Sequence, residues 1–126
     1  MSEWPRYYVL VGRTAIAVDM LSWAEGFEKR LRDGRTGTDP WRVARDELDG
    51  CGVSTVFLGI DHRFGGGGDP ILFETMIFGG PLDGGQWRYA TYDQAERGHA
   101  EAVTQASIAC AKIKAIADAV GATTEN

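Results

Sequence analysis

Cysteine and histidine are scarce in this chain, and neither forms a recognisable motif. Two cysteines and two histidines occur among the 126 residues, and their spacing matches no zinc-binding or disulfide pattern. A nucleophile motif such as G-x-S-x-G is missing as well, and Cys51 has no evident activating partner. These absences disfavour a metalloprotein, a disulfide-stapled scaffold and an enzyme. They favour a reducing cytoplasmic location and a protein without a cofactor.

Long hydrophobic runs and an excess of positive charge are also missing. No apolar run approaches the roughly 20 residues that a membrane-spanning helix requires, and the opening MSEWPRYY lacks the regions of a signal peptide. Thirteen Lys and Arg against eighteen Asp and Glu give a formal net charge of −5. Such a charge disfavours binding to a nucleic-acid backbone or an anionic membrane. We therefore expect a protein that binds neither directly.

Apolar residues are plentiful and make up 44% of the sequence. At this length, that content suffices to bury the core of one domain without disulfides or metal. The sequence has no internal repeat, and its polar segment at residues 35–40 is too short for an interdomain linker. A single domain over residues 1–126 is therefore expected.

Two strongly apolar runs lie in the middle of the chain, at residues 53–61 and 71–78. Their β-branched, aromatic and aliphatic side chains are typical of strands that are at least half buried. We predict that they form the central strands of a sheet. Alternation places Phe57 and Asp61 on the same face of the first strand. Glu74 stands among large apolar residues of the second strand, where a carboxylate requires a donor partner.

The N-terminal part of the chain predicts a hairpin followed by a helix. Residues 7–18 contain two short β-prone runs around a Gly-Arg pair, which is typical of a two-residue turn. Asp19 is a good N-cap, and apolar residues recur at helical spacing after it. We predict a β-hairpin over 7–18 and an amphipathic helix over 20–33 that ends at Gly34.

Two further strands should flank the central pair. Residues 41–48 precede a glycine-containing turn, so we expect them to pair antiparallel with the first central strand. Residues 87–90 come after another glycine-rich turn and predict a fourth strand. The expected fold class is α+β: a mainly antiparallel sheet of four to six strands, one packed amphipathic helix and a long C-terminal helix.

The C-terminal helix is predicted over residues 92–120. Thr91 and Gln94 form a capping box at its start, and Ala, Ile, Lys and Glu dominate the remainder of the segment. At 1.5 Å per residue this helix would be about 43 Å long, longer than a domain of this size is wide. Ile108 and Ile116 lie beside its main stripe of small apolar residues. The helix therefore predicts self-association, as a homodimer or higher homo-oligomer.

Polar and aromatic residues gather near the ends of the central strands and beside a loop with four consecutive glycines, residues 65–68. The candidate ligand-binding residues are Asp61, His62, Arg63, Phe64, Glu74, Arg88 and Tyr89. Loops on a rigid sheet commonly carry binding residues. A structural interpretation stays open, in which His62 faces solvent and Glu74 pairs across the sheet with Arg88 or Arg45. A metal site or acid/base dyad could also be drawn from Asp61, His62, Glu74 and His99, although the spacing matches no metal motif.

An anion-binding pocket is a second interpretation of the same region. The four glycines match neither a P-loop nor a dinucleotide fingerprint, so phosphates would have to meet arginine side chains. The candidate arginines are Arg13, Arg42, Arg45, Arg63 and Arg88, and the candidate stacking residues are Trp41, Phe64, Trp87 and Tyr89. In the structural alternative, the aromatic rings belong to the core and the arginines to the surface.

Several segments resemble a family of small proteins encoded by tailed bacteriophages and prophages. The likeness spans residues 7–103, and its most distinctive pieces are STVFLGIDH, LFETM and RY-x-T-x-x-x-A-x-x-GH. The chain is also similar in size and expected architecture to the Thoeris anti-defence sponge family. That resemblance implies a non-catalytic viral protein of the host cytoplasm that sequesters a cyclic ADP-ribose or cyclic oligonucleotide immune signal.

Three functions remain as hypotheses. The first is an inhibitor of bacterial antiviral defence that captures a small nucleotide ligand. The alternatives are a protein-binding inhibitor of a host defence complex, similar to an anti-CRISPR protein, and a metal-dependent hydrolase.

Overall fold

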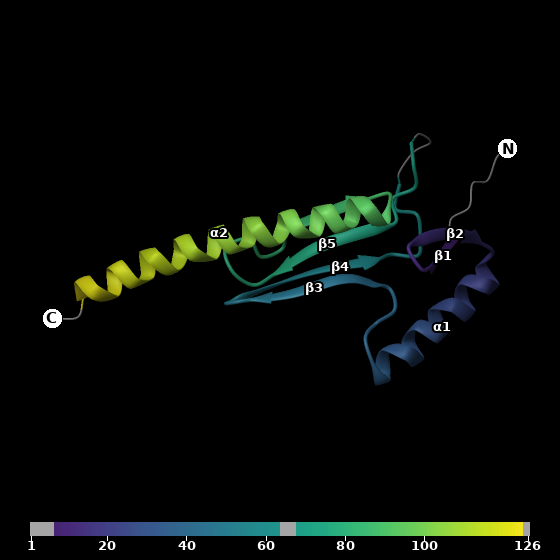
Figure 1. Cartoon of the computed structure of the whole chain (residues 1–126), viewed down its shortest axis with the longest axis horizontal. Coiled ribbons are helices and arrows are strands. Elements are labelled where there is room, and N and C mark those ends of the chain that lie inside the picture. The colour runs from purple at the N-terminus through teal and green to yellow at the C-terminus, as the bar shows by residue number, and fades with distance from the viewer. Residues whose placement is uncertain (1–6, 64–67, 125–126) are drawn as a thin grey trace.

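A computed structural model describes residues 7–63 and 68–124 of the chain. It contains two helices and two antiparallel sheets, which confirms the α+β class (Figure 1). The elements in chain order are β1 (Tyr7–Val11), β2 (Thr14–Val18), α1 (Met20–Thr36), β3 (Arg42–Leu48), β4 (Cys51–Phe57), β5 (Phe73–Phe78), β6 (Gln86–Tyr89) and α2 (Tyr92–Thr124).

The main sheet has the strand order β3-β4-β5-β6, and all neighbours are antiparallel. The two predicted central strands are therefore central. Their register pairs three sets of inward-facing residues: Val53 with Ile77, Thr55 with Thr75, and Phe57 with Phe73. These are also the largest fully buried side chains of the described chain. The predicted alternation of the two strands is thus confirmed.

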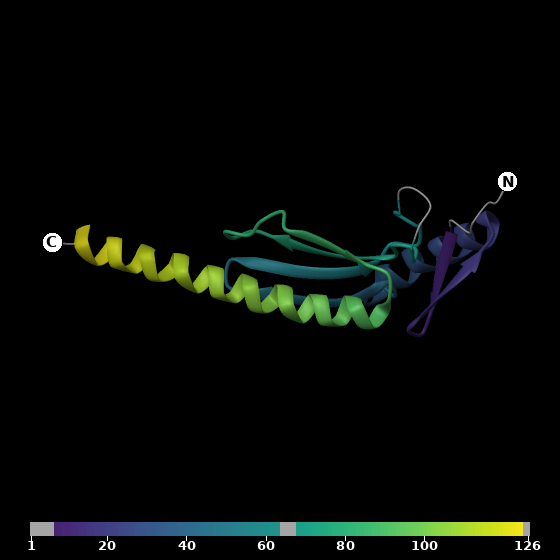
Figure 2. The same cartoon turned by 90° about the horizontal axis from the view of Figure 1, so that it is seen from above.

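Helix α2 covers this inner face, whereas neither described helix covers the opposite face of the sheet (Figure 2). Its contact stripe consists of small residues, with Ala95, Ala102 and Ala106 almost completely buried. Small side chains let the helix backbone come close to the strands. No helix in the described part of the chain is long and apolar enough to cross a bilayer.

The N-terminal elements form a separate unit at one end of the sheet. Strands β1 and β2 pair as predicted but make their own two-stranded sheet. Helix α1 packs with this unit, so α2 rather than α1 lies on the face of the main sheet. Trp23 and Phe27 of α1 stack at 5.2 Å and contact the buried Trp41 ring. Large aromatic rings need a thick apolar layer, which this end of the sheet provides.

Two predicted boundaries were wrong because glycines did not act as expected. Gly34 and Gly121 were predicted to end the helices, yet both helices continue to Thr36 and Thr124. Neither glycine adopts the left-handed conformation of a C-cap.

The end of β4 also differs from the predicted one. Gly59 has a φ of 79°, and its carbonyl accepts from the amide of Tyr8 at 2.9 Å. The chain therefore bends toward β1, and β4 ends at Phe57 rather than at residue 61.

Gly98 lies inside α2, where the Tyr89 ring presses against the helix backbone. A Cβ atom at residue 98 would overlap the Tyr89 ring. We expect Gly98→Ala to destabilise the fold by about 1–3 kcal/mol through overpacking, although alanine favours helix. In a Tyr89→Ala background the same change should be neutral or stabilising. Urea denaturation of the four variants measures this coupling.

Gly121→Ala serves as the control on the same helix, since nothing lies within 4 Å of a Cβ there. This substitution should leave the urea midpoint of unfolding unchanged or raise it slightly. An equal loss of stability for Gly98→Ala with and without the Tyr89 ring would contradict the packing account.

Candidate functional site

Asp61 organises the loop that comes after β4. Its Oδ1 atom accepts hydrogen bonds from the backbone amides of Arg63 at 2.8 Å and Ile71 at 2.9 Å. Its Oδ2 atom lies 3.1 Å from the Arg63 guanidinium, and the Asp61 side chain is only 1% exposed. The Arg63 guanidinium also donates to the carbonyl of Gly68. The Asp61 carboxylate therefore joins the two ends of this loop.

The neighbouring residues are engaged in the same loop. His62 Nδ1 lies 2.8 Å from the Ile60 carbonyl, so this nitrogen carries a proton and donates. Burial, and next the nearby Asp61 carboxylate, raises the pKa of Tyr8, whereas Arg63 lowers it. Phe64, the fourth candidate of this segment, lies outside the described residues.

Glu74 and Arg88 pair on the face of the sheet opposite α2. They are direct neighbours in the β5–β6 register, and Glu74 Oε2 accepts from Arg88 Nε at 2.9 Å. Gln86 Nε2 donates to the same oxygen at 2.5 Å. Glu74 thus has the cross-strand partner that the structural interpretation required. Tyr89, the next residue of β6, points to the other face and contacts Gly98.

Among the described candidate residues, the charged groups therefore pair with close neighbours in separate places. Asp61 pairs with Arg63, Glu74 pairs with Arg88, and Tyr89 packs under α2. The candidate arginines are dispersed in the same way. Arg13 binds Asp93 and Glu96 at 2.6 and 2.5 Å, and Arg45 binds Glu47 at 2.8 Å. The candidate stacking residue Trp41 belongs to the core, with 5% exposure.

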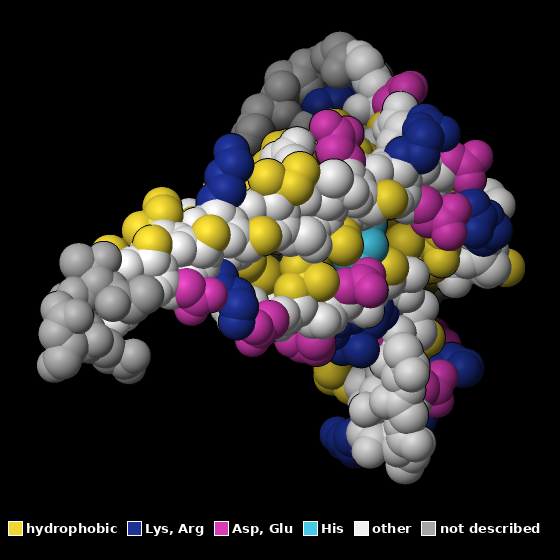
Figure 3. All heavy atoms as spheres, turned by 60° about the vertical axis from the view of Figure 1, so that its left-hand side comes forward, with side chains coloured by type: hydrophobic (Ala, Val, Ile, Leu, Met, Phe, Trp, Pro, Cys, Tyr) yellow, Lys and Arg dark blue, Asp and Glu magenta, His cyan; other side chains and the backbone are white. Residues whose placement is uncertain are grey.

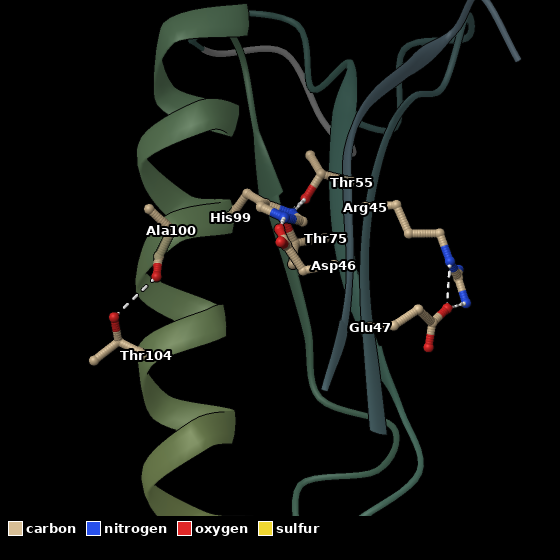
Figure 4. Close-up of polar contacts among 8 residues, drawn as sticks. All are labelled: Arg45, Asp46, Glu47, Thr55, Thr75, His99, Ala100 and Thr104. Carbon is tan, nitrogen blue, oxygen red and sulfur yellow. Dashed lines mark hydrogen bonds and ion pairs between the residues drawn. The ribbon is translucent and has the colours of Figure 1, made fainter. Parts of the chain in front are cut away.

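A buried polar network lies where sequence reasoning noted only isolated residues. His99 of α2 points at the sheet and is 5% exposed (Figure 4). Its Nε2 lies 2.7 Å from Asp46 Oδ2, and its Nδ1 lies 2.7 Å from Thr55 Oγ1. Thr55 Oγ1 in turn lies 2.5 Å from Thr75 Oγ1. The network joins α2 to β3, β4 and β5.

One set of donors and acceptors fits this network when the His99 ring is neutral and Asp46 is a carboxylate. His99 Nε2 then carries the ring proton and donates to Asp46. Thr55 donates to His99 Nδ1, and Thr75 donates to Thr55. Each hydrogen bond uses one proton, and every ring nitrogen has a partner. A buried network satisfied in this way also specifies how the helix sits on the sheet.

The order Asp46, His99, Thr55 resembles the acid–base–hydroxyl series of hydrolases. Thr55 and Thr75 are both 0% exposed, however, so no substrate can reach either hydroxyl. The arrangement supports a structural role. Two features of the sequence could have indicated this network. Two threonines on the inner faces of the central strands require polar partners, and His99 lies on the same helix stripe as Ala102 and Ala106.

A row of exposed apolar side chains lies on α2. The helix has 33 residues, so it is about 50 Å long, whereas the seven residues of β4 span about 23 Å. It therefore continues beyond the sheet (Figure 1). Residues 111–120 are all exposed. We call residues 107–121 distal α2. Its large aliphatic side chains are 52–60% exposed and are Ile108, Ile113, Ile116 and Val120 (Figure 3).

A groove of about 540 Å³ lies where α2 leaves the sheet. One wall comes from the β3–β4 and β5–β6 turns and the other from distal α2. The lining residues are Leu48, Asp49, Gly50, Gly80, Pro81, Ser107, Cys110, Ala111, Ile113 and Lys114. Beside the groove, Cys51 and Cys110 approach each other, with their Sγ atoms 3.5 Å apart. Cys51 therefore has a neighbouring thiol that its sequence context did not indicate.

Residues 7–63 and 68–124 contain no group of three or more His, Cys, Asp or Glu side chains able to hold a metal ion. Comparison with known proteins found no matching family model, no matching curated protein and no matching solved structure. The function must therefore be argued from the surfaces of this chain.

Replacing His99 by Leu should destabilise the fold by about 1–3 kcal/mol, because the buried Thr55 hydroxyl loses its partner on the helix. Asp46→Asn should cost less, because an amide oxygen still accepts from His99 Nε2. Equilibrium denaturation in urea measures both.

Thr104→Ala is the control, since the Thr104 hydroxyl bonds only the Ala100 carbonyl on the exposed side of α2 (Figure 4). It should change stability by less than about 0.5 kcal/mol. Equal effects of His99→Leu and Thr104→Ala would contradict the account of the network.

Proposed function

We propose that the protein is a non-catalytic binding protein that works as a homodimer, with distal α2 and the adjacent groove as the dimer interface. The observation that carries this proposal is the apolar stripe of α2. The stripe packs on the sheet through Ala102 and Ala106 and then continues at the same helical spacing through Ile113, Ala117 and Val120. Past the sheet edge, Ile113 of this stripe is 52% exposed.

An uncovered helix end of this kind needs a partner to be stable. Helices without tertiary contacts are marginal in water, because packing supplies most of their stability. Burying each large aliphatic side chain in an interface contributes about 1.5–3 kcal/mol to the free energy of association. A second copy of the chain can provide that cover, since it presents the same apolar stripe.

The charges of distal α2 favour an antiparallel, two-fold arrangement. Lys114 and Asp118 lie on the same flank of the helix, one turn apart. A two-fold axis near Ile116 sets each Lys114 opposite Asp118 of the second copy, so the complementary pair forms twice. In this arrangement the C-terminal turn of the second copy's α2 lies against the groove beside Cys110 and Ile113.

Protein binding is favoured over nucleotide capture by the state of the charged groups. A nucleotide at the predicted residues would have to open the Asp61–Arg63 and Glu74–Arg88 pairs. Protein binding requires no such rearrangement, because the uncovered face of the sheet already presents Phe78 at 47% exposure. In the phage setting that the sequence resemblance implies, a dimer with two such faces would act on a host protein.

Analytical ultracentrifugation should show a species of twice the chain mass of 13.7 kDa. The double variant Ile113→Glu/Val120→Glu should be monomeric. Lys114→Asp and Asp118→Lys should each weaken dimerisation on the order of 10-fold, because each creates two like-charge contacts. The double swap should restore it, which a general loss of stability would not.

Ile108→Glu is the matched control, because Ile108 is rotated by about 200° from Ala106 around the helix. It should leave the dimer intact. A wild-type protein that stays monomeric at about 100 µM, far above the Kd of a stable homodimer, would refute the proposal.

Isothermal titration with cyclic ADP-ribose isomers and cyclic di- and trinucleotides is expected to give no heat. Heat that disappears with Arg88→Ala would instead favour nucleotide capture at the Glu74–Arg88 pair. That result would leave the dimer interface untouched.

A further inference from the structure

Cys51 and Cys110 come from distant parts of the chain and meet where α2 leaves the sheet. Cys51 begins β4 and is 7% exposed, whereas Cys110 lies on α2 and is partly exposed. Both are free thiols, with their Sγ atoms 3.5 Å apart. A disulfide requires an S–S distance of about 2.05 Å, so the sulfurs need to approach by only about 1.5 Å. Side-chain rotation of two cysteines supplies a movement of this size.

The thiols are enclosed on one side and accessible on the other. The β5–β6 turn crosses close to them: a Cβ atom at Gly80 would lie 3.2 Å from both Cys110 Sγ and Cys51 Cβ. On the other side, Cys110 forms part of the groove wall. In a single copy of the chain, a small oxidant can therefore reach Cys110 through the groove, while Cys51 is protected behind it.

We propose that Cys51 and Cys110 form a reversible intramolecular disulfide when the protein meets a peroxide, which fixes α2 to β4. The disulfide needs no second copy of the chain, but a dimer formed through the groove would cover Cys110 and slow its oxidation. The pairing rests on two thiols that the fold brings into contact, with one facing a groove and the other buried.

The oxidation proceeds in two steps. The Cys110 thiolate attacks one oxygen of hydrogen peroxide, the O–O bond breaks, and the departing hydroxide takes up a proton, leaving a sulfenic acid on Cys110. The Cys51 sulfur then attacks the Cys110 sulfur as its own proton departs. The S–O bond breaks and water leaves. In total, two thiols and one hydrogen peroxide give one disulfide and two waters.

The environment also predicts that Cys110 reacts first. Burial, and next the contact with Cys110, raises the pKa of the Cys51 thiol. A thiol with a raised pKa is a poor nucleophile toward peroxide, so Cys51 suits the resolving role. The two residues are 59 positions apart, and closing so long a loop restricts the unfolded chain strongly.

The test uses the purified full chain and hydrogen peroxide. After oxidation, alkylation under denaturing conditions should modify neither cysteine, and intact mass should fall by two hydrogen atoms. The Tm should rise on the order of 10 °C and return to its original value with dithiothreitol. The same result is expected for Ile113→Glu/Val120→Glu, which separates this proposal from the dimer.

The single variants Cys51→Ala and Cys110→Ala keep a small apolar side chain at each position, and neither should show a peroxide-dependent rise in Tm. In Cys51→Ala, a sulfenic acid should be trapped on Cys110 by dimedone. Three results would overturn the proposal: both thiols stay alkylatable, oxidation yields only intermolecular disulfides, or the intramolecular bond forms without any change in Tm.

Discussion

Close packing of α2 on the inner faces of β4 and β5 governs the arrangement of the remaining structure. The contact combines alanines on the helix with Val53, Phe57 and Ile77 on the strands, so helix and sheet can approach closely. Within this apolar layer, the Thr55 hydroxyl would lose its bond to the helix without His99, and Thr75 is joined to His99 only through Thr55. His99 has to face them, and this requirement sets both the rotation and the position of the helix. Polar groups inside the layer therefore specify the alignment that apolar packing alone leaves loose.

Once α2 is aligned in this way, its length has consequences beyond the sheet. The strands end after about half of the helix, and the stripe that was buried over them emerges as Ile113 and Val120. At the same point the β3–β4 and β5–β6 turns form a groove with the helix, and Cys110 comes to lie beside Cys51. The proposed interface and the proposed redox pair thus arise from one feature, a helix longer than its sheet.

The charged groups favoured from sequence are paired within the protein. Asp61 was predicted at the end of a central strand, but β4 ends at Phe57, and Asp61 holds the following loop together through Arg63 and the amide of Ile71. Glu74 was correctly identified as a carboxylate in need of a donor, and Arg88 is that donor. In both cases the sequence indicated a polar group that requires a partner. For Glu74 the sequence named Arg88 as one of two possible cross-strand partners, whereas for Asp61 it named none.

Local interactions are what the sequence by itself determined. The Asp19 and Thr91–Gln94 caps, the period-2 alternation of β4 and β5, and the hairpin at residues 7–18 all depend on neighbours in the chain, and all were predictable. Tertiary structure alone decided which distant side chains meet: His99 with Thr55, and Cys51 with Cys110. It also decided that α2 rather than α1 covers the sheet. These contacts join residues tens of positions apart, and no short-range pattern encodes them, because they depend on how whole elements share one buried layer.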